Sequence, residues 1–75
     1  RIDLRQQIDK VLEHLSPDHR AVVVLKDIED LSQEEIADTL GVSVGTIKSR
    51  LSRARAHLRD LLLPLYTEWT GKDTI

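Results

Sequence analysis

The chain has 75 residues, of which 40% are hydrophobic and 32% are charged. That length allows one small domain and excludes a large enzyme with a deep cleft, and the composition is too apolar for a disordered segment. With no Cys, disulfides, thiolate catalysis and thiolate metal sites are excluded. No apolar run approaches the ~20 residues that span a membrane, and no signal-peptide pattern opens the sequence. Because the chain begins at Arg1 and lacks Met, we expect it to be a piece of a longer protein.

The net charge of −2 conceals a strong asymmetry along the chain. Residues 1–40 carry five basic and ten acidic side chains, whereas residues 41–59 carry five basic side chains and no acidic one. This concentrated positive charge favours a nucleic-acid partner. The alternative is the solvated face of an ordinary bundle helix, but such a face normally mixes both signs to form i,i+4 pairs.

Hydrophobic spacing predicts two helices in the first 30 residues. Ser16 is a favourable N-cap and Pro17 suits the first helical position, so the second helix is expected to run from Pro17 to about Ile28. The β-branched run at residues 21–25 leaves a strand as the alternative, although the cap and the continued spacing favour a helix. The first helix is expected from apolar residues at helical spacing, which are Leu4, Ile8, Val11, Leu12 and Leu15.

The next two helices are joined by a very short link. A capping box of Ser32 and Glu35 begins a short third helix, and Gly41 ends it. Ser43, two residues later, caps a longer fourth helix. A short helix, a three-residue turn with Gly and a longer helix form the signature of a helix-turn-helix. The sequence therefore predicts an all-α fold, a small four-helix domain that contains a helix-turn-helix.

The fourth helix is expected to run from Val44 to about Leu63, where Pro64 ends it. We expect residues 1–63 to form the domain and residues 64–75 to form a loosely ordered C-terminal tail. Tyr66 and Trp69 lie in this tail, where they either complete the core or dock on a partner.

The fourth helix has two contrasting faces. One face is a low ridge of small residues with basic residues on both sides. Such a face fits a major groove, because small side chains allow close approach to bases and long cationic side chains reach phosphates. The inward stripe consists of Ile47, Leu51, Ala54, Leu58 and Leu61. The ridge consists of Gly45, Ser49, Ser52 and Ala56, with Lys48, Arg55 and Arg59 on one side and Arg50 and Arg53 on the other.

Two runs of sequence resemble a known family. Residues 31–37, LSQEEIA, and residues 40–55, with their VGTIKSRLSRAR segment, closely resemble region 4 of bacterial RNA polymerase sigma factors. Within these the chain is similar to the extracytoplasmic-function (ECF) group, over roughly residues 5–62. The resemblance implies a sigma region 4 fold, unrelated to winged-helix proteins, that recognises the minus-35 promoter element and directs transcription initiation in the bacterial cytoplasm. It also implies docking on the β-subunit flap of the polymerase, control by an anti-sigma factor, and a GGAAC-like DNA core.

The resemblance carries over to individual positions. Two positions depart from the family pattern, since Asp30 stands where Gly is common and Gln33 where an aromatic residue is common. The residues implied to read bases are Lys48, Ser49, Ser52 and Arg53. Those implied to contact or approach the DNA backbone are Lys26, Gln33, Glu34, Thr46, Arg50 and Arg55.

Each implied contact has a plainer alternative. Lys48 either pairs with guanine, the commonest specific contact, or binds a phosphate. Ser49 and Ser52 either touch bases or are mere spacers. Glu34 either lies near phosphates or compensates the dipole of its helix.

No residue pattern indicates catalysis or a bound cofactor. His14, His19 and His57 lack the spacing of a metal site, and the adjacent Glu34 and Glu35 point in different directions on a helix. We expect no enzyme activity, no cofactor, no metal, no small-molecule substrate and no membrane insertion. Two other classes remain open. One is a sigma-like interaction module that binds an anti-sigma factor without DNA, and the other is a dimeric regulator that binds a two-fold site.

Overall fold

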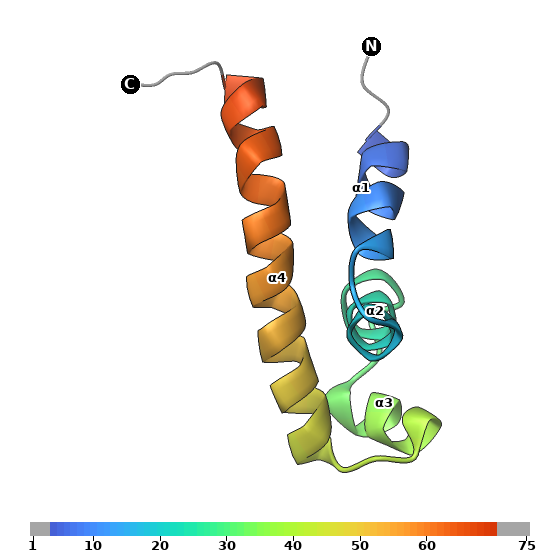
Figure 1. Ribbon diagram of the computed structural model, residues 1–75. Coiled ribbons are helices and arrows are strands. Elements are labelled where there is room, and N and C mark those ends of the chain that lie inside the picture. The colour runs from blue at the N-terminus through green and yellow to red at the C-terminus, as the bar shows by residue number, and fades with distance from the viewer. Residues whose placement is uncertain (1–3, 71–75) are drawn as a thin grey trace.

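The computed structural model describes residues 4–70, with side chains for residues 5–64 (Figure 1). Within that part of the chain all regular structure is helical and no strand is present. The prediction of an all-α domain with a helix-turn-helix is therefore confirmed. The elements are α1 (Leu4–Glu13), α2 (Pro17–Val23), the π-helical segment η1 (Val24–Ile28), α3 (Gln33–Leu40) and α4 (Val44–Thr70).

Helix α4 has 27 residues, and α1, α2 and α3 all pack on it. Figure 1 shows α3 near the start of α4, α2 beside its middle and α1 beside its C-terminal half. In this view α2 is seen nearly end-on while α4 lies in the plane, so the two helices cross steeply. The helix-turn-helix and α1 are consequently at opposite ends of the domain.

The core is built from small aliphatic side chains, as expected of a chain without Phe. The inward stripe of α4 is confirmed: Ile47 and Ala54 are completely buried, Leu51 nearly so, and Leu58 and Leu61 are partly buried. This arrangement follows from spacing, because residues three and four apart share one face of a helix. The stripe packs on buried side chains from the other helices and from the link between α1 and α2, namely Leu12, Leu15, Val22, Val23, Ile36 and Ala37.

A complete capping box begins α3, as predicted. The backbone amide of Glu35 donates to Ser32 Oγ at 3.0 Å, and the amide of Ser32 donates to Glu35 Oε1 at 2.8 Å. These two bonds satisfy amides that have no partner within the helix. The hydrogen bond from the Ser32 backbone amide, followed by that from its side chain, lowers the pKa of Glu35 below its ordinary value.

The second helix begins as predicted but changes type before its end. Ser16 Oγ accepts a hydrogen bond from the amide of His19 at 3.3 Å, and the strand alternative is wrong. From Val24 the chain forms the π-helix η1, in which the amide of Glu29 bonds to the carbonyl of Val24 at 2.9 Å. An uninterrupted α-helix was therefore wrong here. Five residues make little more than one turn, so hydrophobic spacing cannot distinguish a π turn from an α turn.

Asp30 lies between η1 and α3 in a left-handed backbone conformation, with φ of 63°. The next amide, of Leu31, reaches back to the carbonyl of Leu25 at 2.9 Å, so the chain reverses direction sharply here. Only Gly adopts this conformation without strain, although Asp tolerates it better than most residues. This requirement explains why Gly is common at this position in the family that the sequence resembles.

The prediction that Pro64 ends the fourth helix was wrong, because α4 continues to Thr70 with Pro64 inside it. Proline lacks the amide that would bond to the carbonyl of Asp60, and its ring crowds that carbonyl. Because Pro64 is exposed, water can reach the carbonyl that has lost its partner. The side chains of residues 65–70 and all of residues 71–75 lie outside the described residues, and so do the predictions about Tyr66, Trp69 and a loose tail.

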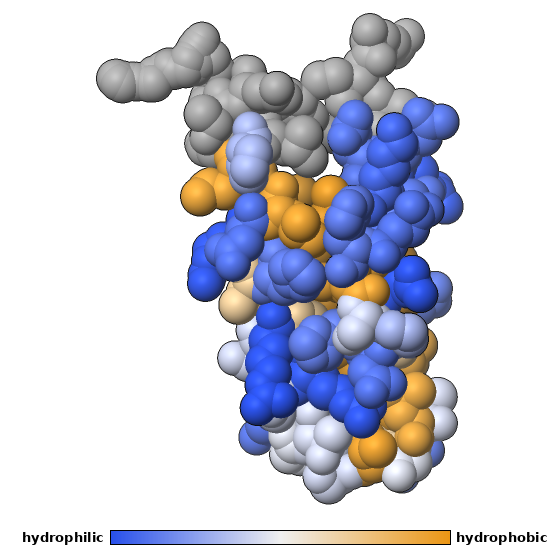
Figure 2. Space-filling view, viewed as in Figure 1, coloured by the Kyte–Doolittle hydropathy of each residue, from blue (hydrophilic) through white to orange (hydrophobic). Residues whose placement is uncertain are grey.

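Apolar surface remains uncovered at the end of the domain away from the helix-turn-helix. Only the last turns of α1 reach the core, and Ile8 is 49% exposed although the sequence placed it on an inward stripe. Leu62 and Leu63 of α4 are also exposed. Figure 2 shows hydrophobic surface where the C-terminal half of α4 lies beside α1, and a second hydrophobic patch at the lower right among hydrophilic and near-neutral residues. The helical period is correct here, but no described element covers these positions.

Candidate nucleic-acid interface

The turn between α3 and α4 is built by Gly41. Its φ of 72° is left-handed, which ends α3, and its amide donates to the carbonyl of Ala37 at 2.8 Å. The amide of Val42 bonds to the same carbonyl at 3.1 Å. These bonds reverse the chain within three residues, so α4 begins close to α3 as in a helix-turn-helix.

Ser43 caps the start of α4, as predicted. Its Oγ accepts from the amide of Thr46 at 3.1 Å, and its carbonyl accepts from the amide of Ile47 at 3.1 Å. Ser43 Oγ also lies 3.0 Å from the hydroxyl of Thr46. Thr46, a predicted backbone contact, is thus a half-buried residue of the first turn of α4, with its hydroxyl already bonded to the cap.

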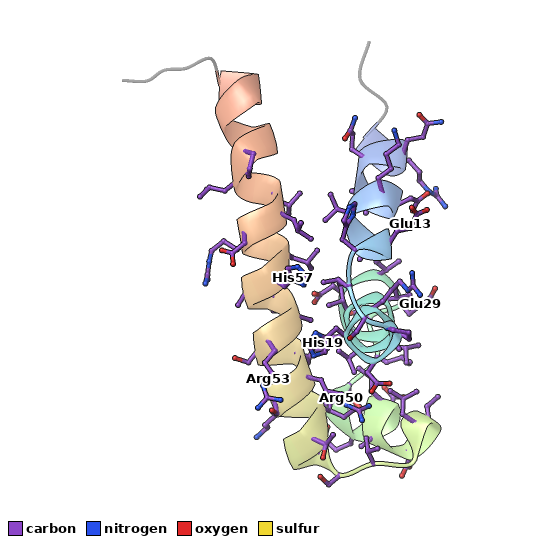
Figure 3. The ribbon with its side chains drawn as sticks, viewed as in Figure 1. Glu13, His19, Glu29, Arg50, Arg53 and His57 are labelled. Carbon is purple, nitrogen blue, oxygen red and sulfur yellow. The ribbon has the colours of Figure 1, made fainter. Side chains whose placement is uncertain are left out.

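The outer face of α4 presents the predicted base-reading residues together. We use "outer face" for Gly45, Lys48, Ser49, Ser52, Arg53, Ala56 and Arg59, all of which are exposed except the half-buried Ala56. Figure 3 shows Arg53 pointing away from the rest of the domain. The outer face therefore combines small side chains with three exposed cations, opposite the buried stripe, and nothing in the described part of the chain obstructs it.

Arg50 and Arg55 turn toward the domain instead. Arg55 Nη2 donates to Asp27 Oδ1 at 2.7 Å, and Arg50 Nη2 lies 3.8 Å from Asp18 Oδ2. Figure 3 shows Arg50 directed from α4 toward α2 and α3. Both arginines were predicted to contact the DNA backbone, and their acidic neighbours were missed. Opposite charges far apart in sequence carry no local signal, so only the fold brings them together.

The remaining backbone candidates lie on η1 and at the start of α3. Lys26 of η1 and Gln33 of α3 are half-buried, whereas Glu34 is exposed in the first turn of α3. A carboxylate in the first turn of a helix is stabilised by the helix dipole, which is the plainer explanation for Glu34. These residues are on the helix-turn-helix side of the domain but not on the outer face of α4.

The histidines form no recognisable metal site. His14 Nδ1 lies 2.8 Å from the backbone carbonyl of Lys10, a local bond within the end of α1. Among the described residues, no group of three or more His, Asp or Glu could hold a metal ion. Likewise, none of the helices in residues 4–70 has the length and hydropathy to cross a bilayer.

Comparisons with known proteins match most of this chain. Residues 5–58 match the family model of sigma-70, region 4. The ECF RNA polymerase sigma factor SigE of Mycolicibacterium smegmatis is 52% identical over 59 residues, which cover 79% of this chain and 23% of that protein. The RNA polymerase sigma-E factor of Streptomyces coelicolor is 53% identical over 53 residues, covering 71% of this chain and 30% of that protein. The ECF RNA polymerase sigma-E factor of Escherichia coli is 38% identical over 63 residues, covering 84% of this chain and 33% of that protein. The chain thus spans a quarter to a third of these relatives.

Proposed function

Because the chain belongs to the sigma-70 region 4 family, in its extracytoplasmic-function group, we propose that it binds the minus-35 element of bacterial promoters. Its relatives are sigma factors by name, and a region 4 domain is part of a transcription factor and not an enzyme. In the longer protein, this domain would help RNA polymerase to begin transcription at selected promoters. That work takes place in the bacterial cytoplasm, where the chromosome lies.

The outer face of α4 is the observation that carries this proposal. It begins directly after the helix-turn-helix turn, and a second helix in this position enters the major groove with its N-terminal residues against the bases. Small exposed side chains at Gly45, Ser49 and Ser52 permit close approach, while Lys48 and Arg53 are long enough to reach base edges or phosphates. The positive end of the helix dipole points toward the duplex as well.

The proposed contacts divide by chemistry. Lys48 and Arg53 read bases through hydrogen bonds to acceptors in the groove, and Ser49 and Ser52 lie at the same surface. The residues assigned to contact or approach the DNA backbone, independently of sequence, are Lys26, Gln33, Glu34, Thr46, Arg50 and Arg55. Glu34 can only approach it, because an ionised carboxylate has no proton to donate to a phosphate. Arg50 and Arg55 first have to leave their acidic neighbours.

The proposal includes a polymerase-binding surface away from the DNA. Docking on the β-subunit flap is implied by the family, and the exposed side chains of Ile8, Leu62 and Leu63 supply apolar surface for it. This surface lies at the end opposite the helix-turn-helix, so DNA and polymerase can be bound together (Figure 2). An anti-sigma factor that covers either surface would keep the protein inactive.

The proposal is tested by fluorescence anisotropy with two short duplexes, one carrying a GGAAC core and the other a scramble of it. We expect wild type to prefer the GGAAC duplex, with affinity that falls steeply as salt rises. Lys48→Ala should lose about 1–3 kcal/mol of that preference, the usual value of one specific pairing.

Lys10→Ala is the matched control, because it removes the same charge from an exposed position on α1. It should leave the preference unchanged. Absence of binding to both duplexes at low salt would contradict the proposed function and favour an interaction module, whereas equal preference in Lys48→Ala and wild type would contradict the assignment of Lys48.

A further inference from the structure

The five cations of residues 41–59 fall into two groups in the folded domain. Lys48, Arg53 and Arg59 are exposed on the outer face, and among the described residues none of them pairs with a carboxylate. Arg50 and Arg55 flank the buried stripe of α4 on its two sides, where Arg50 faces Asp18 of α2 and Arg55 faces Asp27 of η1. The positive charge available to DNA is therefore smaller than the sequence suggests.

The contact between Arg55 and Asp27 is the stronger of the two. Arg55 Nη2 and Asp27 Oδ1 are 2.7 Å apart, the distance of a charge-assisted hydrogen bond. The Arg50–Asp18 separation of 3.8 Å exceeds hydrogen-bond range, and the Arg50 side chain is only 25% exposed. Arg50 is thus the more buried of the two arginines, whereas only Arg55 makes a direct hydrogen bond to its carboxylate.

Asp27 and Arg55 both remain open to solvent and hence to a ligand. Their side chains are 43% and 50% exposed, respectively. A guanidinium binds carboxylate and phosphate with the same fork of donors, so a nearby phosphate competes with Asp27 for Arg55. An ion pair this exposed contributes little to stability, so breaking it is inexpensive.

We propose that the Asp27 carboxylate takes the place of a DNA phosphate on Arg55. Asp27 thereby withholds Arg55 from DNA and limits the affinity of α4 for any duplex. The inference rests on the proposed DNA-binding function. The π turn of η1 carries Asp27, so the departure from α-helical geometry lies in the segment that supplies this carboxylate. Because phosphate contacts are independent of sequence, Asp27 would limit binding to specific and non-specific DNA alike.

The proposal gives Asp27→Asn a signature that can be measured. The variant keeps the size of the side chain but releases Arg55, so both duplexes should bind about two- to fivefold more tightly. The slope of log affinity against log salt should steepen by about 0.9, corresponding to one more neutralised phosphate. Preference for the GGAAC duplex over its scramble should not change.

Glu29→Gln is the matched control, since Glu29 is also exposed and follows η1 directly. It removes one negative charge near the same surface, so a purely general effect of charge would tighten binding equally in both variants. The proposal expects Glu29→Gln to have the smaller effect. It also expects Asp27→Asn to have no effect in an Arg55→Ala background, because Asp27 acts only through Arg55.

The experiment is an anisotropy titration of the 75-residue chain and these variants, over several salt concentrations. Equal effects of Asp27→Asn and Glu29→Gln, or an undiminished effect in the Arg55→Ala background, would overturn the inference while leaving the proposed function intact. Weaker binding by Asp27→Asn would overturn it too, because Asp27 would then position Arg55 for DNA. If wild type bound neither duplex, the proposed function itself would fail and this inference with it.

Discussion

Aliphatic side chains serve different purposes in the two halves of α4. In its first half, Ile47, Leu51 and Ala54 are buried under α2 and α3, and the opposite side carries small and cationic residues. In its second half, Leu62 and Leu63 are exposed, and only α1 lies alongside. We call the first half with α3 and η1 the recognition end, and the second half with α1 the leucine end.

The difference indicates which surfaces the domain completes by itself. At the recognition end, the buried stripe of α4 packs against α2 and α3, and the outer face of α4 remains available for a ligand. At the leucine end, the apolar side chains exceed what α1 covers, so stability there depends less on internal packing. Substitutions should therefore affect folding at one end and, under the proposed function, partner binding at the other.

The largest effect is expected from a pair of truncations that compares the ends directly. Ile47→Ala removes a completely buried side chain and should lower the free energy of unfolding by about 2–5 kcal/mol. Leu62→Ala removes a side chain that is 42% exposed and should change it by about 0.5 kcal/mol or less. Chemical denaturation followed by far-UV circular dichroism measures both values. Equal losses would show that the two ends are packed alike.

The capping box should make the recognition end sensitive to acid. Ser32→Ala removes the cap of α3 and should lower the free energy of unfolding by about 0.5–2 kcal/mol near neutral pH. Since folding lowers the pKa of Glu35, its ionised form adds stability above the unfolded pKa, and this stability is lost as pH falls through the folded pKa.

Glu35→Gln provides the control for this pH dependence, because Gln can also complete a capping box but does not ionise. Denaturation across the acid range should show wild type losing stability relative to Glu35→Gln as pH falls. Parallel pH profiles of the two proteins would contradict the assigned role of the carboxylate.

Making the same substitution at the two glycines of the recognition end should give effects of opposite sign, neither larger than the upper value expected for Ser32→Ala. A Cβ at Gly45 would meet only Ser43 Oγ, at an ordinary 3.8 Å, so Gly45→Ala should stabilise α4 by up to about 1 kcal/mol. Gly41→Ala should instead destabilise the domain by about 1–2 kcal/mol, because φ at Gly41 is left-handed.

DNA binding should respond to Gly45→Ala in the opposite direction to stability. The added methyl group lies on the outer face, so affinity for the GGAAC duplex should fall severalfold if the start of α4 approaches the bases. Thermal melts and anisotropy on the same samples separate the two effects. A more stable variant with unchanged affinity would show that this turn of the helix stays clear of the duplex.

Much of the fold was predictable because its signals are local. The caps at Ser16, Ser32 and Ser43 and the left-handed Gly41 each act within four residues, and the structure confirms all of them. The stripe of α4 follows from helical spacing. The π turn was not predictable, because η1 is too short for hydrophobic spacing to reveal its period. The predicted end of α4 at Pro64 was wrong, because one missing hydrogen bond does not stop an exposed helix.

The candidate site was predictable in part, for the same reason. Lys48, Ser49, Ser52 and Arg53 come together on the outer face as helical geometry requires, although their contacts with bases stay predictions. The acidic neighbours of Arg50 and Arg55 were missed, because those contacts depend on how α2 and η1 lie against α4. Net charge along the sequence therefore overstated the cationic surface that folding leaves unpaired.

The central claim is that the recognition end binds DNA through the first half of α4. It is tested most directly by following backbone amide signals of the isotope-labelled chain by NMR while the GGAAC duplex is added. We expect the largest shifts in residues 44–53, smaller shifts at the start of α3 and at η1, and almost none in α1. Shifts confined to α1 and the second half of α4, or no shifts at all, would contradict the account.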